Sequence, residues 1–200
     1  MKIGAVIATS IELIDQVLVS KQTSRFIINN HIKKNRFIGA KDKKLLYDLV
    51  FNTLKKYFSL IKVCKKNKVS IQLRNLVLLN VFNQKIAHSL KEVYDGKYSI
   101  IAKKEDKQIL DIAMQLEEVI LPSFPSWIEE RLSIATFKKI NNIYKKILIE
   151  PKFDIAINVL SYSREQIRKK LTNLNIKCKN TICSPYGITV LKRIPKNNLW

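Results

Sequence analysis

A lysine-rich amphipathic segment begins at Asp42 and is the strongest pattern in the chain. Its apolar side chains recur at spacings of three and four residues: Leu45, Leu46, Leu49, Val50, Leu54, Tyr57, Phe58 and Ile61. Lysines occupy many of the positions between them. A helix with one apolar stripe packs against other elements on that side and meets water on the other. The spacing predicts a helix of about five or six turns at the centre of a helical domain, with Asp42 as its N-cap.

Helical spacing of apolar residues also predicts the neighbouring elements. The expected helices cover residues 5–20, 24–32, 73–82, 103–119 and 137–148. Thr23 or Ser24 is expected to cap the second of these helices, and Ser70 the third. The third is apolar on most sides, so it is expected to be largely buried. Pro122 and Pro125 indicate a boundary, because a proline within a helix loses a backbone hydrogen bond and clashes with the preceding turn.

After Pro151 the apolar period changes from helical to alternating. Phe153–Val159 alternates apolar and polar side chains, which predicts a strand, and Ser163 is expected to cap a short helix. Short strands are expected over 176–178, 181–183 and 187–191. The expected fold class is therefore mainly α, with an all-helical domain followed by a small α+β module of β-α-β-β order. The expected domains are 1–121, a pair of linking helices over 122–150, and the module over 151–200.

The formal net charge of +21 is unevenly distributed. Residues 21–70 hold 14 Lys and Arg against two Asp, and residues 151–200 hold 10 against two acidic residues, whereas residues 71–150 hold 12 against 10. A codon bias toward lysine would spread the charge more evenly. Two basic zones beside a neutral one indicate surfaces that meet a polyanion. Nucleic acid is the favoured polyanion, and membrane headgroups are the alternative.

The remaining composition argues against several other classes of protein. The uncharged apolar runs are shorter than the roughly 20 residues that cross a bilayer, so no membrane association is expected. The three cysteines, Cys64, Cys178 and Cys183, show no CxxC spacing, and the chain has only two histidines. No metal site and no disulfide framework are expected, and reduced thiols indicate a cytoplasmic protein.

The segment Phe37–Leu54, with its Gly39-Ala40-Lys41-Asp42-Lys43 step into a long helix, resembles the NusB-like domain at the front of RsmB-type rRNA cytosine-C5 methyltransferases. In that family an arginine usually follows the aspartate, where this chain has Lys43. Val93–Tyr98 is similar to a glycine-containing loop of the same domain.

Further segments resemble later parts of the same family, in the same order. Pro125–Ile128 is similar to the Pro-x-Trp-Leu motif at the exit of the NusB-like domain, and Pro151–Asn158 is similar to the proline-led strand that opens the small α+β module. Ser163–Glu165 and Ser184–Ile188 are similar to later parts of that module. The resemblance covers nearly the whole chain.

The resemblance implies a methyltransferase whose catalytic domain this chain does not contain. The full-length family uses S-adenosylmethionine, held by a glycine-rich turn, and a nucleophilic cysteine. The four glycines of this chain are far apart in the sequence, so no cofactor and no catalytic residue are expected here. Cys183 in Thr181-Ile182-Cys183-Ser184-Pro185 superficially resembles the catalytic motif, but it lies within the small module. We expect Cys183 to be a buried or half-buried strand cysteine. The resemblance leaves open whether this chain works as part of an enzyme.

The predicted function is the RNA-binding, substrate-targeting portion of a small-subunit rRNA methyltransferase, truncated before its catalytic domain. The expected partners are rRNA and a separate methyltransferase domain in trans. The candidate RNA-binding residues are Lys33, Lys34, Arg36, Lys41, Lys43, Lys44, Arg168, Lys169, Lys170, Lys192 and Arg193. Phe37, Tyr47 and Tyr186 are candidates for stacking on bases, although aromatics on helices are more often core residues.

Two other hypotheses stay open. In the first hypothesis, the reading frame is a fragment of a split or decayed methyltransferase gene, as the apolar ending Leu199-Trp200 suggests. Alternatively, the chain is a NusB-like transcription antitermination factor. The added β-α-β-β module argues against this alternative, since a plain NusB would end near residue 140.

Overall fold

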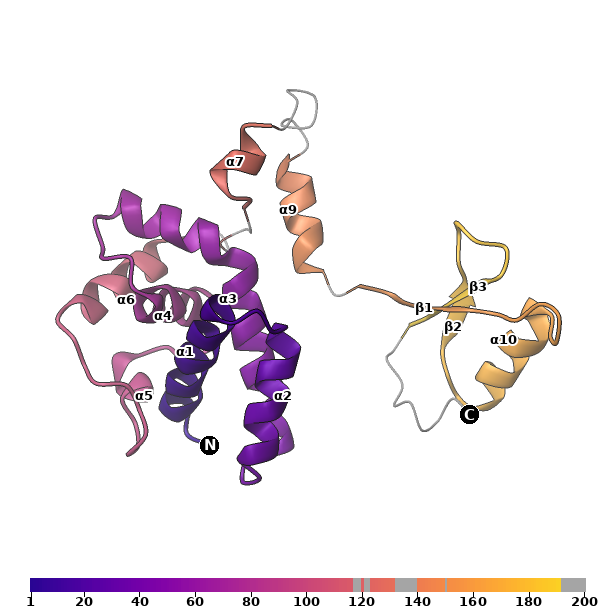
Figure 1. Cartoon of the computed structure of the whole chain (residues 1–200), viewed down its shortest axis with the longest axis horizontal. Helices are drawn as coiled ribbons and strands as arrows, with labels where there is room; N and C mark the ends of the chain where they lie inside the picture. Colours follow the sequence, from indigo (N-terminus) through magenta and orange to yellow (C-terminus); the bar gives the residue numbers. More distant parts are fainter. Residues whose placement is uncertain (117–119, 121–122, 132–139, 150, 192–200) are drawn as a thin grey trace. The chain divides into compact units, whose positions relative to one another are not determined.

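The structure is a computed structural model of the whole chain, and it describes residues 1–116, 120, 123–131, 140–149 and 151–191. The chain divides into two compact units, Met1–Leu148 and Ile149–Trp200. The first unit is helical and the second is a small α+β module, so the predicted mainly α fold class is confirmed (Figure 1). The expected helix residues Val119 and Phe137 and the expected boundary residue Pro122 lie outside the described residues.

The first unit is built from helices of very different lengths. Their bounds are α1 Ile3–Val19, α2 Ser24–Lys34, α3 Ala40–Lys66, α4 Leu73–Asn83, α5 Leu90–Val93, α6 Glu105–Gln115, α7 Ser126–Glu129 and α9 Ile140–Leu148. The long helix α3 has 27 residues, so it is longer than the apolar stripe alone indicates. Its lysine-rich last turns extend it beyond Ile61.

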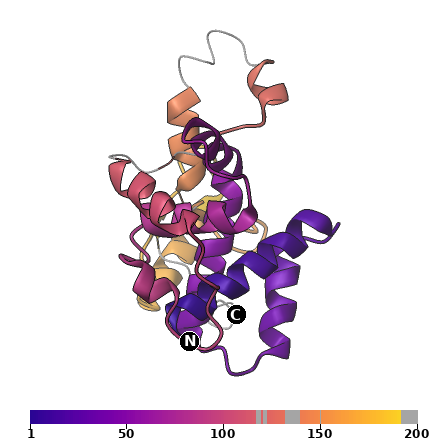
Figure 2. The same ribbon diagram turned by 90° about the vertical axis from the view of Figure 1, so that its left-hand side faces the viewer.

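The core of this unit forms where α1, α3 and α4 pack against one another (Figure 2). The apolar stripe of α3 supplies Leu46, Leu49, Val50 and Leu60, all fully buried. Burial of a side chain of this size contributes about 1.5–3 kcal/mol relative to exposure. Helix α4 is buried on nearly all sides, as predicted, because α6 covers the face that α1 and α3 leave open.

In the first unit, the helix starts differ from the predicted caps in two of three places. Thr23 caps α2 as predicted, since its hydroxyl accepts a hydrogen bond from the Phe26 N–H at 3.3 Å. The N-cap of α3, however, is Gly39, and Asp42 lies inside the first turn. The prediction for Asp42 is wrong because its carboxylate binds the Met1 amino group at 2.7 Å instead. There it also interacts favourably with the positive end of the helix dipole.

The second wrong prediction is that Ser70 caps α4. The helix begins three residues after Ser70, and its N-cap is Gln72. The Ser70 hydroxyl donates to the Glu105 carboxylate at 2.7 Å and accepts from the Asn75 side-chain amide at 2.8 Å. The Asn75 amide also donates to Glu105 at 2.9 Å. Ser70 therefore joins the starts of α4 and α6 rather than capping a helix.

A buried ion pair fixes α4, α5 and α6 relative to one another. The fully buried Asp106 carboxylate accepts hydrogen bonds from the Arg74 guanidinium, the Tyr94 hydroxyl and the Lys103 backbone N–H. Burial alone would raise the pKa of Asp106, but these three donors outweigh it and hold the pKa below its usual value. Burial and the bond to Asp106 raise the pKa of Tyr94 to about 12.

The helices that follow Pro125 belong to the first unit because they attach to α3. Lys62 on α3 pairs with the Glu129 carboxylate at 2.8 Å, and the Tyr144 hydroxyl of α9 donates to the same carboxylate at 2.8 Å. The rings of Phe124 and Tyr144 lie 5.4 Å apart. A single carboxylate thus joins α3, α7 and α9.

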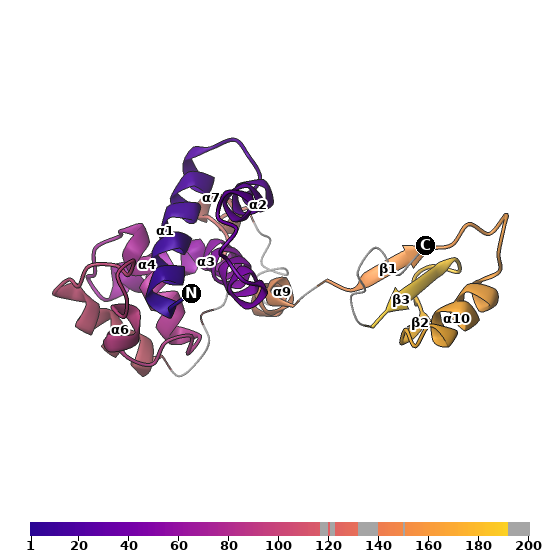
Figure 3. The same cartoon turned by 90° about the horizontal axis from the view of Figure 1, so that it is seen from below.

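The second unit contains β1 Phe153–Ala156, α10 Arg164–Asn173, β2 Cys178–Asn180 and β3 Gly187–Val190. The three strands form an antiparallel sheet in the order β1-β3-β2, with α10 packed against β2 and β3 (Figure 3). Ser163 caps α10 as predicted, in a capping box with Gln166.

The strand expected over 181–183 does not form, and β1 ends at Ala156 rather than Val159. Thr181 accounts for the missing strand, because its hydroxyl donates to the Ser184 carbonyl at 3.1 Å and closes a turn. Cys183 is exposed on this turn, so the expectation of a buried or half-buried strand cysteine is wrong.

Candidate nucleic-acid interface

Six of the predicted RNA-binding residues lie close together where α2 ends and α3 begins. Lys33 and Lys34 form the last turn of α2, Arg36 is in the connecting loop, and the remaining three are in the first turns of α3. The α2–α3 basic cluster is defined as Lys33, Lys34, Arg36, Lys41, Lys43 and Lys44. All six side chains are exposed. Within the part of the chain that the structure describes, none of them forms an ion pair.

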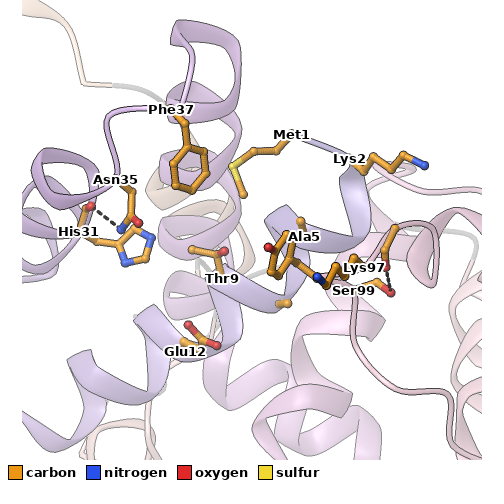
Figure 4. Close-up of a pocket in the computed structure, with 13 residues that line it drawn as sticks. Met1, Lys2, Ala5, Thr9, Glu12, His31, Asn35, Phe37, Lys97 and Ser99 are labelled. Carbon is orange, nitrogen blue, oxygen red and sulfur yellow. Dashed lines mark hydrogen bonds between the residues drawn. The ribbon is translucent and has the colours of Figure 1, made fainter.

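An open cavity of about 820 Å³ lies beside this cluster (Figure 4). Three segments far apart in the sequence form its walls. The first turns of α1 supply one wall, the end of α2 and the following loop supply another, and the Gly96–Ser99 loop supplies the third. Its volume falls within the range of about 300–1,000 Å³ that is typical of ligand pockets. The segments that contain Phe37 and Gly96 therefore meet at one cavity.

Two strongly exposed aromatic rings line this cavity. Phe37 is 73% exposed and Tyr98 is 74% exposed, and they come from different walls. Figure 4 shows the Phe37 ring directed toward the space beside Thr9. Exposed aromatic rings beside basic residues are typical of surfaces on which unpaired bases stack.

The polar residues that line the cavity include several without a protein partner. Thr9, Glu12 and His31 have no side-chain hydrogen bond to any residue within the described segments. The Asn35 amide nitrogen donates to the His31 carbonyl at 2.9 Å, which holds the loop against the end of α2 and leaves the amide oxygen available. The cavity therefore presents a hydroxyl, a carboxylate, an imidazole and an amide oxygen to a ligand.

Most of the acidic groups around the cavity are neutralised by the protein itself. Asp42 binds the Met1 amino group, and Asp95 binds Lys2 at 2.8 Å. Lys97 is exposed, and its ammonium group lies 5.9 Å from the centre of the Tyr98 ring. Glu12, the carboxylate that lines the cavity itself, has no cationic partner within the described residues. The positive charge near the cavity comes from Lys97 and from the adjacent α2–α3 basic cluster.

Two glycines allow the third wall to form. Gly96 has a φ of +101°, a backbone conformation that residues with a Cβ rarely adopt, and this turns the loop back toward α1. Gly4 permits a close approach, since a Cβ at that position would lie 2.4 Å from the Val93 carbonyl oxygen. The Ser99 hydroxyl, at 2.8 Å from both the Tyr94 and Gly96 carbonyl oxygens, holds the loop closed.

The predicted RNA-binding residues of the second unit, unlike those of the α2–α3 basic cluster, include cations that contact neighbouring side chains. Arg168 pairs with Glu165 at 2.9 Å, and the Lys170 ammonium group lies 4.1 Å from the centre of the Tyr162 ring. Lys169 is exposed on the same helix, and Tyr186 is exposed before β3. Lys192 and Arg193 lie outside the described residues. Two of the three described cations are therefore partly engaged within their own unit.

Of the predicted stacking residues, Phe37 alone lines the cavity. Tyr47 is half-buried on α3, where its ring stacks on Phe51 with 6.0 Å between centres and its hydroxyl bonds to Asn29. Tyr98 was missed by the sequence-based prediction. The Gly96-Lys97-Tyr98 sequence, which combines a turn, a cation and an aromatic residue, is the signal that points to it.

The four glycines lie at the start of α1, before α3, in the loop after α5 and at the start of β3. They do not form the glycine-rich turn that would hold S-adenosylmethionine, so the residues present do not fit that cofactor. Among the described residues no cluster of His, Cys, Asp and Glu could hold a metal ion. No helix in those segments is both long and apolar enough to cross a bilayer.

Comparison with known proteins leaves the chain without a demonstrated family. No protein-family model matches the chain, and no curated protein matches it. A solved structure similar to it is the crystal structure of PH0851, with 15% sequence identity over 97% of this chain and a TM-score of 0.49. The chain spans 50% of the length of that protein.

Proposed function

We propose that this chain binds structured rRNA and serves as the targeting portion of a small-subunit rRNA cytosine-C5 methyltransferase of the RsmB type. The observation that carries the RNA-binding proposal is the α2–α3 basic cluster, six exposed cations without ion pairs in the described structure. Lysine and arginine side chains in such a cluster bind phosphates and release the counterions that these phosphates had condensed.

The methyltransferase part of the proposal is supported by the ordered resemblance of the segments that contain Gly39, Gly96, Trp127, Phe153 and Ser163 to that family. The chain has no glycine-rich turn for S-adenosylmethionine. Methyl transfer therefore requires a separate catalytic domain that binds this cofactor, and this chain contributes RNA affinity and positioning. A NusB-like antitermination factor is less well supported, because a plain NusB would have no counterpart of the unit formed by residues 149–200.

Charge-neutral variants of the full chain test the proposal. Lys33→Gln/Lys34→Gln/Arg36→Gln removes three cations of the cluster, and Lys65→Gln/Lys66→Gln/Lys68→Gln removes three exposed cations near the other end of α3. The two variants have the same net charge. Fluorescence anisotropy with labelled hairpins that tile the small-subunit rRNA measures their affinities.

The cluster variant is expected to weaken binding by roughly tenfold to a hundredfold at low salt, because each lost phosphate contact removes one counterion-release contribution. The control variant is expected to bind nearly as the wild type does. Equal affinities of the two variants, or no affinity of the wild type for any hairpin, would contradict the proposal.

A further inference from the structure

The cavity of the first unit has features that go beyond general attraction to phosphates. A basic surface alone binds any nucleic acid without regard to base pairing. This cavity adds two exposed rings, Phe37 and Tyr98, and polar side chains that have no partner within the described protein. A duplex buries the faces of its bases in the stack, so rings of this kind are useful only for bases that are unpaired.

We infer that the cavity between α1, the α2–α3 loop and the Gly96–Ser99 loop binds an unpaired nucleotide of the RNA, with its base stacked on Phe37 and Tyr98. This inference rests on the proposed RNA-binding function and names the part of the RNA that the site recognises. The two rings come from walls that are 61 positions apart in the sequence (37 and 98), yet they border one cavity.

The charge around the cavity fits an anionic occupant. The α2–α3 basic cluster begins immediately beside the lining residues His31, Asn35 and Phe37, so it borders one wall. Lys97 supplies a further cation at the opposite wall. Since Asp42 and Asp95 are already paired with cations of the protein, they do not repel phosphates strongly. The backbone of an RNA strand can follow the cations while one of its bases enters the cavity.

The lining also supplies groups that bind the edge of a base. The Glu12 carboxylate only accepts hydrogen bonds when ionised, so it suits the amino group or the ring N–H of a base. The Asn35 amide oxygen is a second acceptor, because the amide nitrogen is already bonded to the His31 carbonyl. The Thr9 hydroxyl both donates and accepts. Figure 4 shows Thr9 and Glu12 on the same face of α1, with His31 and Asn35 on the wall next to it.

Truncation of the two rings in the full chain tests this inference. Phe37→Ala and Tyr98→Ala remove exposed rings and leave the core intact, and Phe26→Ala is a matched control because Phe26 is 53% exposed on α2 but does not line the cavity. The probes are a short single-stranded RNA of mixed sequence and the blunt duplex made from it. Circular dichroism checks that all variants stay folded.

Each cavity variant is expected to lose roughly 5- to 150-fold in affinity for the single strand, as expected for one stacked base, while its affinity for the duplex is unchanged. Phe26→Ala is expected to bind both probes as the wild type does. In addition, thiouridine-substituted RNA is expected to crosslink to peptides that contain Phe37 or Tyr98, which mass spectrometry identifies.

The outcomes separate this inference from the proposed function. If the wild type binds both probes with salt-dependent affinity but the cavity variants match it on the single strand, the cavity inference is overturned and the RNA-binding proposal stands. Equal losses on the single strand and the duplex also overturn it, because the duplex has no free base. If the wild type binds neither probe, both are overturned, and binding of an acidic peptide through the same rings would identify a protein partner instead.

Discussion

At the scale of single residues, Lys56 is the least expected feature of the fold. It lies in the middle of α3, with only 1% of its surface exposed, and the described residues provide no ion pair for it. Burial lowers its pKa to about 8, because an ammonium group loses hydration when it is removed from water. Lys56 lies seven residues after Leu49 and four before Leu60, so helical spacing places it on the buried side of α3. Lysine is a residue type that is almost never fully buried, and for this reason its burial was not predicted.

We predict that Lys56→Met raises the free energy of unfolding by about 1–3 kcal/mol near neutral pH, because methionine fills similar space without a charge. The folded-state pKa lies below the ordinary value of 10.5, so the unfolded chain binds more protons between these values. Wild-type stability therefore rises as pH increases from about 8 to about 10, whereas Lys56→Met lacks this contribution.

Urea unfolding near pH 7 and near pH 9.5 measures this change, and the gap between the two proteins is expected to narrow at the higher pH. Lys55→Met, at the neighbouring half-buried lysine, serves as the control and is expected to change stability little. A destabilised Lys56→Met, or a gap that does not change with pH, would show that the Lys56 ammonium group is well solvated or paired in the fold.

At the scale of elements, the start of α1 controls the wall of the cavity. A Cβ on Gly4 would lie 2.4 Å from the Val93 carbonyl oxygen and 2.8 Å from the Ser99 Cβ. Alanine has a higher helix propensity than glycine by about 1 kcal/mol, so propensity alone predicts that Gly4→Ala is stabilising. The close contact predicts the opposite sign, because α1 must move away from the segment that carries Ser99.

We predict that Gly4→Ala lowers the free energy of unfolding by about 1–3 kcal/mol, the usual cost of overpacking. Thermal unfolding followed by circular dichroism measures it. Gly39→Ala is the control for added volume, because a Cβ there has 3.7 Å to its nearest neighbour, an oxygen of Asp42. A loss smaller than that of Gly4→Ala is expected, since Gly39 is the N-cap of α3 and alanine is a poorer N-cap than glycine. Greater stability of Gly4→Ala would mean that α1 and the loop are not in close contact.

The elements themselves were largely predictable from the sequence, whereas their ends were less so. The apolar stripe after Asp42 predicted α3, and Ser163 predicted the start of α10, because both patterns are local. Asp42 and Ser70 were wrongly assigned as caps because each binds a group distant in the sequence, the Met1 amino group and Glu105. Local propensity contains no information about such partners.

The candidate site was predictable only in part, for the same reason. The basic residues near Lys33 and Lys43 form a visible charge cluster in the sequence, so they were found. The cavity depends on the approach of α1, the Phe37 loop and the Tyr98 loop, which only the tertiary fold brings together. The second-unit cations Arg168 and Lys170 were predicted from charge alone, and their engagement with Glu165 and Tyr162 required the structure.

At the scale of the whole molecule, the charge is concentrated rather than uniform. The chain carries a net charge of +21, and residues 21–70, which include the α2–α3 basic cluster, hold 14 of the 37 Lys and Arg. A uniform excess of lysine would attract polyanions weakly over the entire surface. A cluster instead predicts that a few defined contacts supply most of the affinity, and that removing these contacts changes how affinity responds to salt.

The dependence of RNA affinity on salt concentration is the most direct test of the account. For the full chain on an rRNA hairpin, the logarithm of the association constant is expected to fall with the logarithm of salt concentration with a slope of about −4 to −5, as six phosphate contacts require. In Lys33→Gln/Lys34→Gln/Arg36→Gln the slope is expected to be shallower by about 2–3. A slope near zero in the wild type, or the same slope in both proteins, would contradict RNA binding through this cluster.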